Sequence, residues 1–109
     1  MQNFAANAVI EEMVRRIAAS FQPDKIILFG SYARGTESPD SDVDLLVVMP
    51  VEGSRRDRCV DVRMRLRGLG MPKDVVLLTP EEFEKQKDIP GTIGRAAAIE
   101  GKVMYERRH

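Results

Sequence analysis

The chain has 109 residues, and its 17 basic and 17 acidic side chains give a formal net charge of zero. This length predicts a single domain, residues 1–109, which can bury a core without disulfides and has no room for a second catalytic or substrate-binding domain. Because the charges balance, bulk electrostatic capture of DNA or RNA is disfavoured, and we expect no direct nucleic-acid binding.

The first half of the chain predicts a helix followed by two strands. Apolar residues recur at i, i+3, i+4 and i+7 over residues 4–20, which is the spacing of an amphipathic helix that packs on a sheet. Residues 22–24, Gln-Pro-Asp, end this helix and lead to a short buried strand over residues 25–29. A second strand is predicted over residues 42–49, whose last five residues are apolar and which ends before Pro50.

A second helix is predicted over residues 55–69. Its apolar stripe consists of Cys59, Val62, Leu66 and Leu69. The glycines and the proline of residues 68–72 are expected to terminate it.

The last third of the chain predicts one strand, two short helices and a final strand. The strand over residues 74–78 runs into Thr79-Pro-Glu-Glu, a capping-box pattern that starts a helix to about residue 87. A further helix over residues 92–100 is stopped by Gly101, and residues 102–105 form the last strand. This order of elements predicts a small α/β (α+β) domain with a mixed sheet flanked by helices.

Other signals indicate where the protein resides. The single cysteine, Cys59, excludes an intrachain disulfide, and no apolar stretch approaches the ~20 residues that span a membrane. No signal-peptide pattern occurs at the start of the chain, so we expect a cytoplasmic protein with no membrane partner.

Gly30 and Ser31 directly follow the first strand and predict a phosphate-binding turn. Gly30 lacks a Cβ, so its backbone can turn tightly and approach a phosphate. If residues 31–34 start a helical turn, the amides at its beginning and the hydroxyl of Ser31 point toward an anion. Taken alone, a Gly-Ser pair after a strand is more often a plain turn.

Asp42 and Asp44 predict a metal site at the start of the second strand. Side chains alternate along an extended strand, so the two carboxylates point to the same side, about 7 Å apart. Magnesium is held by one or two protein carboxylates together with substrate phosphates and waters. An Asp-x-Asp pair alone is commonly a solvated strand face, but two carboxylates at the edge of a buried strand repel each other unless a cation lies between them. Together with the Gly-Ser turn, the pair favours a nucleotide and Mg²⁺ site.

The two motifs carry a family resemblance. The segment F-G-S-Y-A-R-G at residues 29–35, followed by S-P-D-S-D-V-D-L at residues 38–45, resembles the signature of the DNA polymerase β-like nucleotidyltransferase superfamily. More narrowly, the chain resembles the minimal nucleotidyltransferases, which are the antitoxin partners of HEPN-type toxins. The resemblance implies the polymerase β-like fold, ATP as substrate with a two-ion Mg²⁺ site, and transfer of AMP to a hydroxyl group. It also implies that the acceptor is a tyrosine of a cognate HEPN-type toxin, which the modification silences.

Asp74 and Arg34 are further candidates for the site. The resemblance implies a third carboxylate on a neighbouring strand, which completes the metal site and acts as base toward the attacking hydroxyl, and Asp74 is the matching position. Asp74 could instead pair only with Lys73 or a turn amide at the entry of its strand. Arg34 suits bidentate binding of a phosphate, and equally could brace its loop against Asp40. The catalytic and metal-binding candidates are thus Asp42, Asp44 and Asp74, and the nucleotide-binding candidates are Gly30, Ser31 and Arg34.

The helix predicted at residues 55–69 is rich in arginine, with six arginines in thirteen positions. Most charge runs of this kind are solvated helix faces. Val60 and Met64, however, fall opposite the apolar stripe, while Arg56, Arg63 and Arg67 cluster on one side of it. Since Arg and Met are enriched at interfaces, the pattern also fits a surface for a partner.

Three functions fit the sequence. The first is transfer of AMP from Mg-ATP to the toxin. The second is an antitoxin that neutralises its partner by binding alone, although the intact Gly-Ser pair and both aspartates argue against it. The third is an enzyme that modifies a small molecule such as an aminoglycoside, which the lack of a second domain for that substrate disfavours. The pattern is compatible with a homo- or hetero-oligomer.

Overall fold

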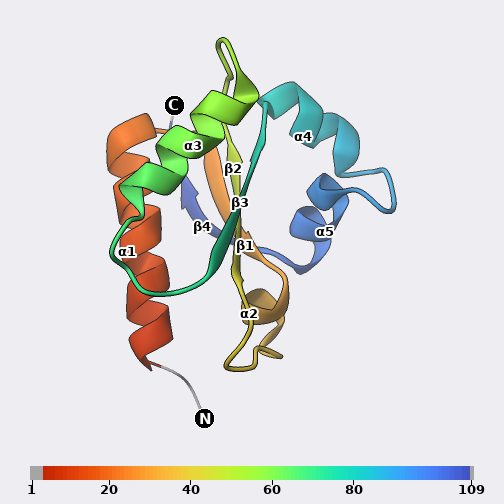
Figure 1. Cartoon of the computed structure of the whole chain (residues 1–109). Coiled ribbons are helices and arrows are strands. Elements are labelled where there is room, and N and C mark those ends of the chain that lie inside the picture. Colours follow the sequence, from red (N-terminus) through yellow and green to blue (C-terminus); the bar gives the residue numbers. More distant parts are fainter. Residues whose placement is uncertain (1–3, 109) are drawn as a thin grey trace.

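The computed structural model describes residues 4–108 and arranges them as a four-stranded sheet with helices on both faces. Figure 1 shows the strands in the middle of the molecule, with α1 and α3 on one side and α4 and α5 on the other. In chain order the elements are α1 (Phe4–Phe21), β1 (Lys25–Phe29), α2 (Ser31–Arg34), β2 (Val43–Val48), α3 (Arg55–Arg65), β3 (Lys73–Leu78), α4 (Pro80–Gln86), α5 (Ile93–Glu100) and β4 (Lys102–Glu106).

The sheet is mixed, as the order of elements predicted. Its strand order is β3-β2-β1-β4. β1 pairs antiparallel with both β2 and β4, whereas β2 and β3 run parallel and are joined by a crossover through α3. A parallel pair requires such a crossover connection, usually a helix. As a result, the end of β1 lies beside the starts of β2 and β3. The three loops attached there meet at this end of the strands, which is the edge of the sheet that carries the candidate site.

Alternation along the strands creates two separate cores. Residues such as Leu45 and Val47 of β2 face α1 and α3, where Met13, Ile17 and Val62 are fully buried. Leu46 and Val48 face the opposite layer, where they pack with Phe83 of α4 and Ala97 of α5. Both faces of β2 are therefore covered from Leu45 onward, which explains the continuous apolar sequence of that part of the strand.

Most predicted boundaries are confirmed to within a residue or two. The helix over residues 4–20 is α1, and the helical turn after Gly30 is α2. The capping box at Thr79 forms as expected, because its hydroxyl accepts from the Glu82 amide while the Glu82 carboxylate accepts from the Thr79 amide. Thr92 acts as the N-cap of α5 and is not part of the helix.

The helix predicted to reach residue 69 is shorter in the structure. α3 ends at Arg65, and the amide of Leu66 donates to the carbonyl of Arg63 in a tightened last turn. Gly68 and Gly70 then take up positive φ angles of 83° and 75°, which turn the chain toward β3. The predicted apolar stripe survives this change, since Leu66 is fully buried and Leu69 packs against the same core.

The second strand is also shorter than predicted, and Asp42 lies outside it. The pairing of β2 with β3 begins at Val43, and the pairing with β1 ends at Asp44, so Asp42 has no partner on either side. Asp42 is exposed in the preceding loop. Strand alternation alone therefore does not place its side chain, although its charge acts on Asp44, and the predicted role of Asp42 stays a prediction.

Across residues 4–108, no helix is both long and apolar enough to cross a membrane.

Candidate active site

Asp44 and Asp74 lie directly beside each other in the sheet. They are register partners on the parallel strands β2 and β3. Adjacent strands are about 4.8 Å apart, so the two backbones hold the carboxylates within the reach of one small ligand. Both residues are two positions before apolar side chains of the α4/α5 core, namely Leu46 and Val76, and so they face the same side of the sheet.

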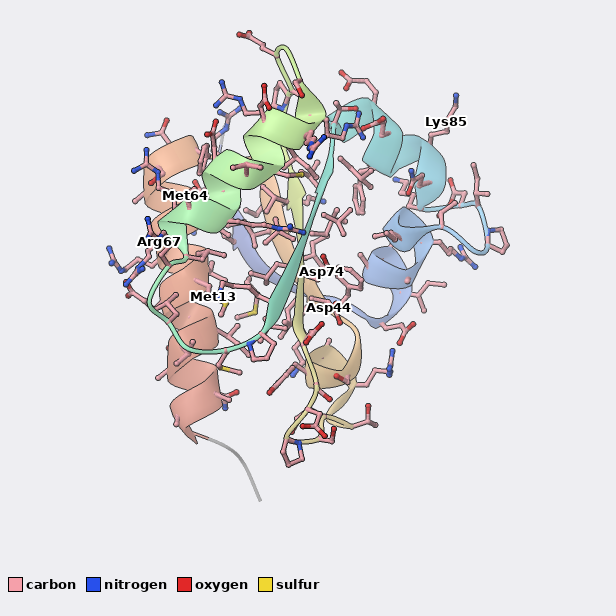
Figure 2. All side chains as sticks on the ribbon, viewed as in Figure 1. Met13, Asp44, Met64, Arg67, Asp74 and Lys85 are labelled. Atoms are coloured by element: carbon pink, nitrogen blue, oxygen red, sulfur yellow. The ribbon has the colours of Figure 1, made fainter. Side chains whose placement is uncertain are left out.

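The helical layer on that side leaves the two aspartates accessible. α4 and α5 cover the far ends of the strands, where Leu46, Val48 and Leu78 are buried. At the near ends Asp44 is half-buried and Asp74 is exposed. Figure 2 shows the two side chains close together, between α5 and α2. The carboxylates of Asp44 and Asp74 are therefore accessible at the end of the sheet that α4 and α5 do not cover.

Gly30 closes the site from the β1 side. Its φ of 75° and ψ of −155° belong to a region that is almost restricted to glycine. Phe29 pairs with Asp44, which brings the turn against that side chain. A Cβ on Gly30 would overlap the Asp44 carboxylate oxygen Oδ2 and lie 3.1 Å from its Cγ. The lack of a side chain therefore lets the backbone of this turn and the Asp44 carboxylate lie in direct contact.

Ser31 begins α2 directly after this glycine, as the sequence predicted. The amides of Ala33 and Arg34 donate to the Gly30 carbonyl, each at 3.1 Å. The first amides of a helix have no acceptor within the helix itself. The amides of residues 31 and 32 therefore stand at the beginning of α2 in a turn that touches the Asp44 carboxylate.

The surroundings of Asp44 disfavour its charged form. Partial burial raises the pKa of Asp44 above its ordinary value of 3.8, and the negative charges of Asp74 and Asp42 raise it further. The positive charge of Arg34 acts in the opposite direction. Asp74 and Asp42 are therefore close enough to disfavour the negative charge of Asp44, and a cation bound beside Asp44 would relieve that repulsion.

Arg63 holds Asp74 in this structure. Its Nη2 donates to Asp74 Oδ1 at 3.3 Å, across the free edge of β3. The pairing of Asp74 with Lys73, which the sequence left open, does not occur, because Lys73 Nζ donates to the Met71 carbonyl. Nothing in the local sequence of β3 points to Arg63; only the packing of α3 beside that strand brings the two together.

Arg34 is engaged by α5. Its Nη1 lies 2.8 Å from Oε2 of Glu100, the last residue of α5. Arg34 thus forms its ion pair with Glu100 and not with Asp40, the partner that the sequence suggested. Glu100 is 66 residues away in the chain, and no sequence signal links the two. The ion pair keeps the guanidinium beside the site, where its charge acts on Asp44.

The carboxylates fit a divalent cation in their chemistry, although they do not converge on a single point. Hard cations such as Mg²⁺ bind carboxylate oxygens and retain waters and substrate phosphates as further ligands. Within residues 4–108, no group of three or more Asp, Glu, His or Cys side chains is arranged to hold a metal ion by itself. Asp44 and its two acidic neighbours therefore suit an ion that arrives with part of its coordination supplied by the substrate.

A cavity of about 490 Å³ adjoins the loops that carry these motifs. Its walls include Tyr32, which follows Ser31, and Pro72, which directly precedes β3. Ser38 and Pro39 of the loop before Asp42 complete that side, while the start of α1 forms the other. None of the six candidate site residues lines this cavity, and its α1 wall belongs to the face of the sheet opposite Asp44 and Asp74, so it does not enlarge the candidate site.

Comparison with known proteins identifies the family. Residues 10–99 match the family model described as Nucleotidyltransferase domain. The chain belongs to this family. Two relatives from Methanocaldococcus jannaschii are named as candidate protein adenylyltransferases. MJ0604 is 33% identical over 99 residues, which cover 88% of this chain and 94% of the relative. MJ1305 is 50% identical over 111 residues, which cover 93% of this chain and 72% of the relative.

Solved structures of related proteins have the same fold. A crystal structure of a candidate nucleotidyltransferase from Sulfolobus solfataricus matches with a TM-score of 0.65 at 26% identity, over 98% of this chain and 91% of the other. A toxin-antitoxin structure with AMP-PNP matches with a TM-score of 0.64 at 21% identity, over 90% and 74% of the two chains. A mutant of the toxin-antitoxin MntA-HpeT matches with a TM-score of 0.65 at 18% identity, over 89% and 73%. The predicted minimal nucleotidyltransferase fold is thus confirmed, and the chain is a nucleotidyltransferase enzyme.

Proposed function

We propose that this nucleotidyltransferase transfers AMP from Mg-ATP to a tyrosine hydroxyl of a HEPN-type toxin, and that the transfer silences the toxin. The observation that carries the proposal is the register pair of Asp44 and Asp74 next to the Gly30 turn. The names of the two Methanocaldococcus relatives support a protein acceptor, and the toxin-antitoxin structures support a toxin as that protein. The AMP-PNP in one of those structures supports ATP as the donor.

The proposal assigns each candidate residue a part. Asp42 and Asp44 would hold Mg²⁺ together with the triphosphate, and Asp74, which is paired with Arg63 in this structure, would supply the third carboxylate. The bound ions would neutralise charge on the phosphates and on the leaving pyrophosphate. The amides after Gly30 and the hydroxyl of Ser31 bind the terminal phosphates, because α2 supplies no acceptors for its first amides. Arg34 adds positive charge beside the same phosphates.

The reaction itself is an in-line displacement. The acceptor oxygen forms a bond to the α-phosphorus, while the bond from that phosphorus to the bridging oxygen breaks and pyrophosphate leaves. The hydroxyl proton goes to the carboxylate of Asp74, which is exposed and stands beside Asp44 at the open edge of the sheet.

A labelling experiment tests this function. The native chain is incubated with Mg²⁺, a purified HEPN-type protein from the same organism, and ATP labelled at either the α- or the γ-phosphate. We expect label on the acceptor from α-labelled ATP alone, and a mass increase equal to AMP on one tyrosine. Asp44→Asn is expected to transfer none, whereas Asp88→Asn serves as control, because Asp88 is exposed in the connection between α4 and α5. Label from γ-labelled ATP, or none from either, would exclude adenylyl transfer to this protein.

A further inference from the structure

The outward face of α3 carries an apolar pair that nothing within residues 4–108 covers. Val60 is 50% exposed and Met64 is 53% exposed, whereas Val62 and Leu66 on the opposite side of the helix are fully buried. Val60 and Met64 are one helical turn apart, so they form a single apolar patch. The sequence placed this pair opposite the core, and the structure confirms it.

Positive charge borders this patch on one side. At about 100° per residue, Arg56 and Arg63 project on the same flank of the pair, and Arg67 continues that flank in the turn after α3. Figure 2 shows Met64 and Arg67 at the end of α3 that lies beside α1. Within the described residues, the side chains of Arg56 and Arg67 form no ion pair, in contrast to Arg55, which binds Glu82. The other flank carries Asp57 and Asp61, and Asp61 pairs with Arg58 at 3.7 Å.

The basic flank leads directly to the candidate active site. Arg63 is its middle member, and the same guanidinium binds Asp74 across the free edge of β3. A protein bound on this flank would therefore lie one side chain away from the carboxylate that receives the acceptor's proton. Among the described residues, no other element that carries an exposed large apolar side chain forms an ion pair with Asp44 or Asp74.

We propose that the patch of Val60 and Met64, with its flank of Arg56, Arg63 and Arg67, is the docking surface for the protein acceptor. This inference rests on the proposed function and deepens it. The partner segment that fits has an apolar side chain for the patch and carboxylates for the arginines. Arg and Met are enriched at interfaces, and complementary charge orients a partner as it approaches. A partner carboxylate that binds Arg63 also competes with Asp74 for it, so docking releases the catalytic carboxylate.

Two surface variants and one control test the proposal with the same HEPN-type protein as probe. Val60→Ser/Met64→Ser removes the apolar patch, and Arg56→Glu/Arg67→Glu reverses the two arginines that hold no acid. Ile99→Ser on α5 is the control, because Ile99 is 63% exposed and lies on the other layer of the molecule. Arg63 is left intact, since its loss would alter Asp74 directly.

We expect each double variant to bind the acceptor at least about tenfold more weakly and to raise KM for the acceptor by a similar factor. The affinity for Mg-ATP should stay at the native value in calorimetry, as should kcat at saturating acceptor. The charge-reversal variant should also lose most of the salt dependence of binding. The control Ile99→Ser should bind and transfer as the native chain does.

Other outcomes separate the two claims. If both double variants bind the acceptor as tightly as the native chain, the docking surface is wrong while adenylyl transfer stands. If the native chain binds the acceptor but transfers no label, the proposed enzymatic function is wrong. The binding measurements on the two double variants then still test whether this patch is the docking surface. If the native chain does not bind this protein at all, the assigned occupant of the surface is wrong.

Discussion

Gly30→Ala is the substitution whose consequence follows most directly from the geometry of the site. The backbone at Gly30 has φ 75° and ψ −155°, which costs about 1–3 kcal/mol for a residue with a Cβ. The added Cβ would also overlap Oδ2 of Asp44 and approach its Cγ. Because Oδ2 is the far end of a side chain that can rotate, we expect the carboxylate to move rather than the strand. The variant should therefore fold, with reduced stability, and should lose AMP transfer because Asp44 is displaced.

Gly35→Ala is the matched control for backbone strain. Gly35 has the same φ of 75°, but a Cβ there meets no atom within 4 Å. Its left-handed conformation costs an alanine roughly 1–2 kcal/mol, so Gly35→Ala should lose stability in urea unfolding, and Gly30→Ala should lose at least as much because its Cβ also meets Asp44. Only Gly30→Ala should lose transfer of label from α-labelled ATP and show weaker Mg-ATP binding in calorimetry. Ser31→Ala should fall between them, because one hydrogen bond contributes about 0.5–1.5 kcal/mol. If Gly30→Ala transfers AMP as well as Gly35→Ala does, the turn is not in contact with the reacting phosphates.

Two further predictions concern charge and stability. Asp44→Asn should unfold at a higher denaturant concentration than the native chain at pH 7 in the absence of nucleotide, because it removes a carboxylate whose pKa is raised by burial and by its acidic neighbours. The difference should shrink as the pH falls toward the ordinary pKa of 3.8, because the raised pKa lets the native carboxyl take up its proton before that point is reached. Equal stability at pH 7 would contradict the repulsion at this site. Glu12→Gln should be less stable than the native chain at pH 7, because Glu12 binds Arg15 and Arg16. Arg16 in turn donates to the carbonyl of Arg65, the last residue of α3, and to the carbonyl of Arg67 in the following turn. The hydrogen bonds from Arg15 and Arg16 lower the pKa of Glu12 from 4.5 to about 2. The contribution of Glu12 to the free energy of unfolding is therefore present above pH 4.5 and should disappear as the pH falls toward 2. If chemical unfolding shows a stability difference between the two chains that does not change over this range, these hydrogen bonds do not stabilise the fold.

The order of elements was predictable because local signals determine it. Apolar periodicity located α1, and the Thr79 capping box located the start of α4. The lengths of α3 and β2 were not predictable in the same way. α3 ends at Arg65, before the glycines that the sequence offered as its stop, and β2 begins only where it gains a neighbour at Val43. The start of β2 depends on tertiary pairing, which the apolar pattern does not contain.

The candidate site was predictable in its members but not in their contacts. The sequence selected Asp44 and Asp74, and the sheet register makes them direct neighbours. The ion pairs of Asp74 with Arg63 and of Arg34 with Glu100 were missed, because each joins residues from different elements. Such contacts follow from how α3 and α5 pack against the sheet, and a single sequence gives no signal for them.

Asp74→Asn provides the most direct test of adenylyl transfer as the means of neutralising the toxin. In the proposed mechanism a carboxylate at this position accepts the hydroxyl proton, whereas the proposed Mg-ATP binding through Asp44 and docking through α3 do not require it. We expect Asp74→Asn to bind Mg-ATP and the HEPN-type protein as the native chain does, to transfer no label from α-labelled ATP, and to leave cells unprotected from the toxin. If the variant protects cells as well as the native chain while no label is transferred, neutralisation occurs by binding alone and the proposed enzymatic function is wrong.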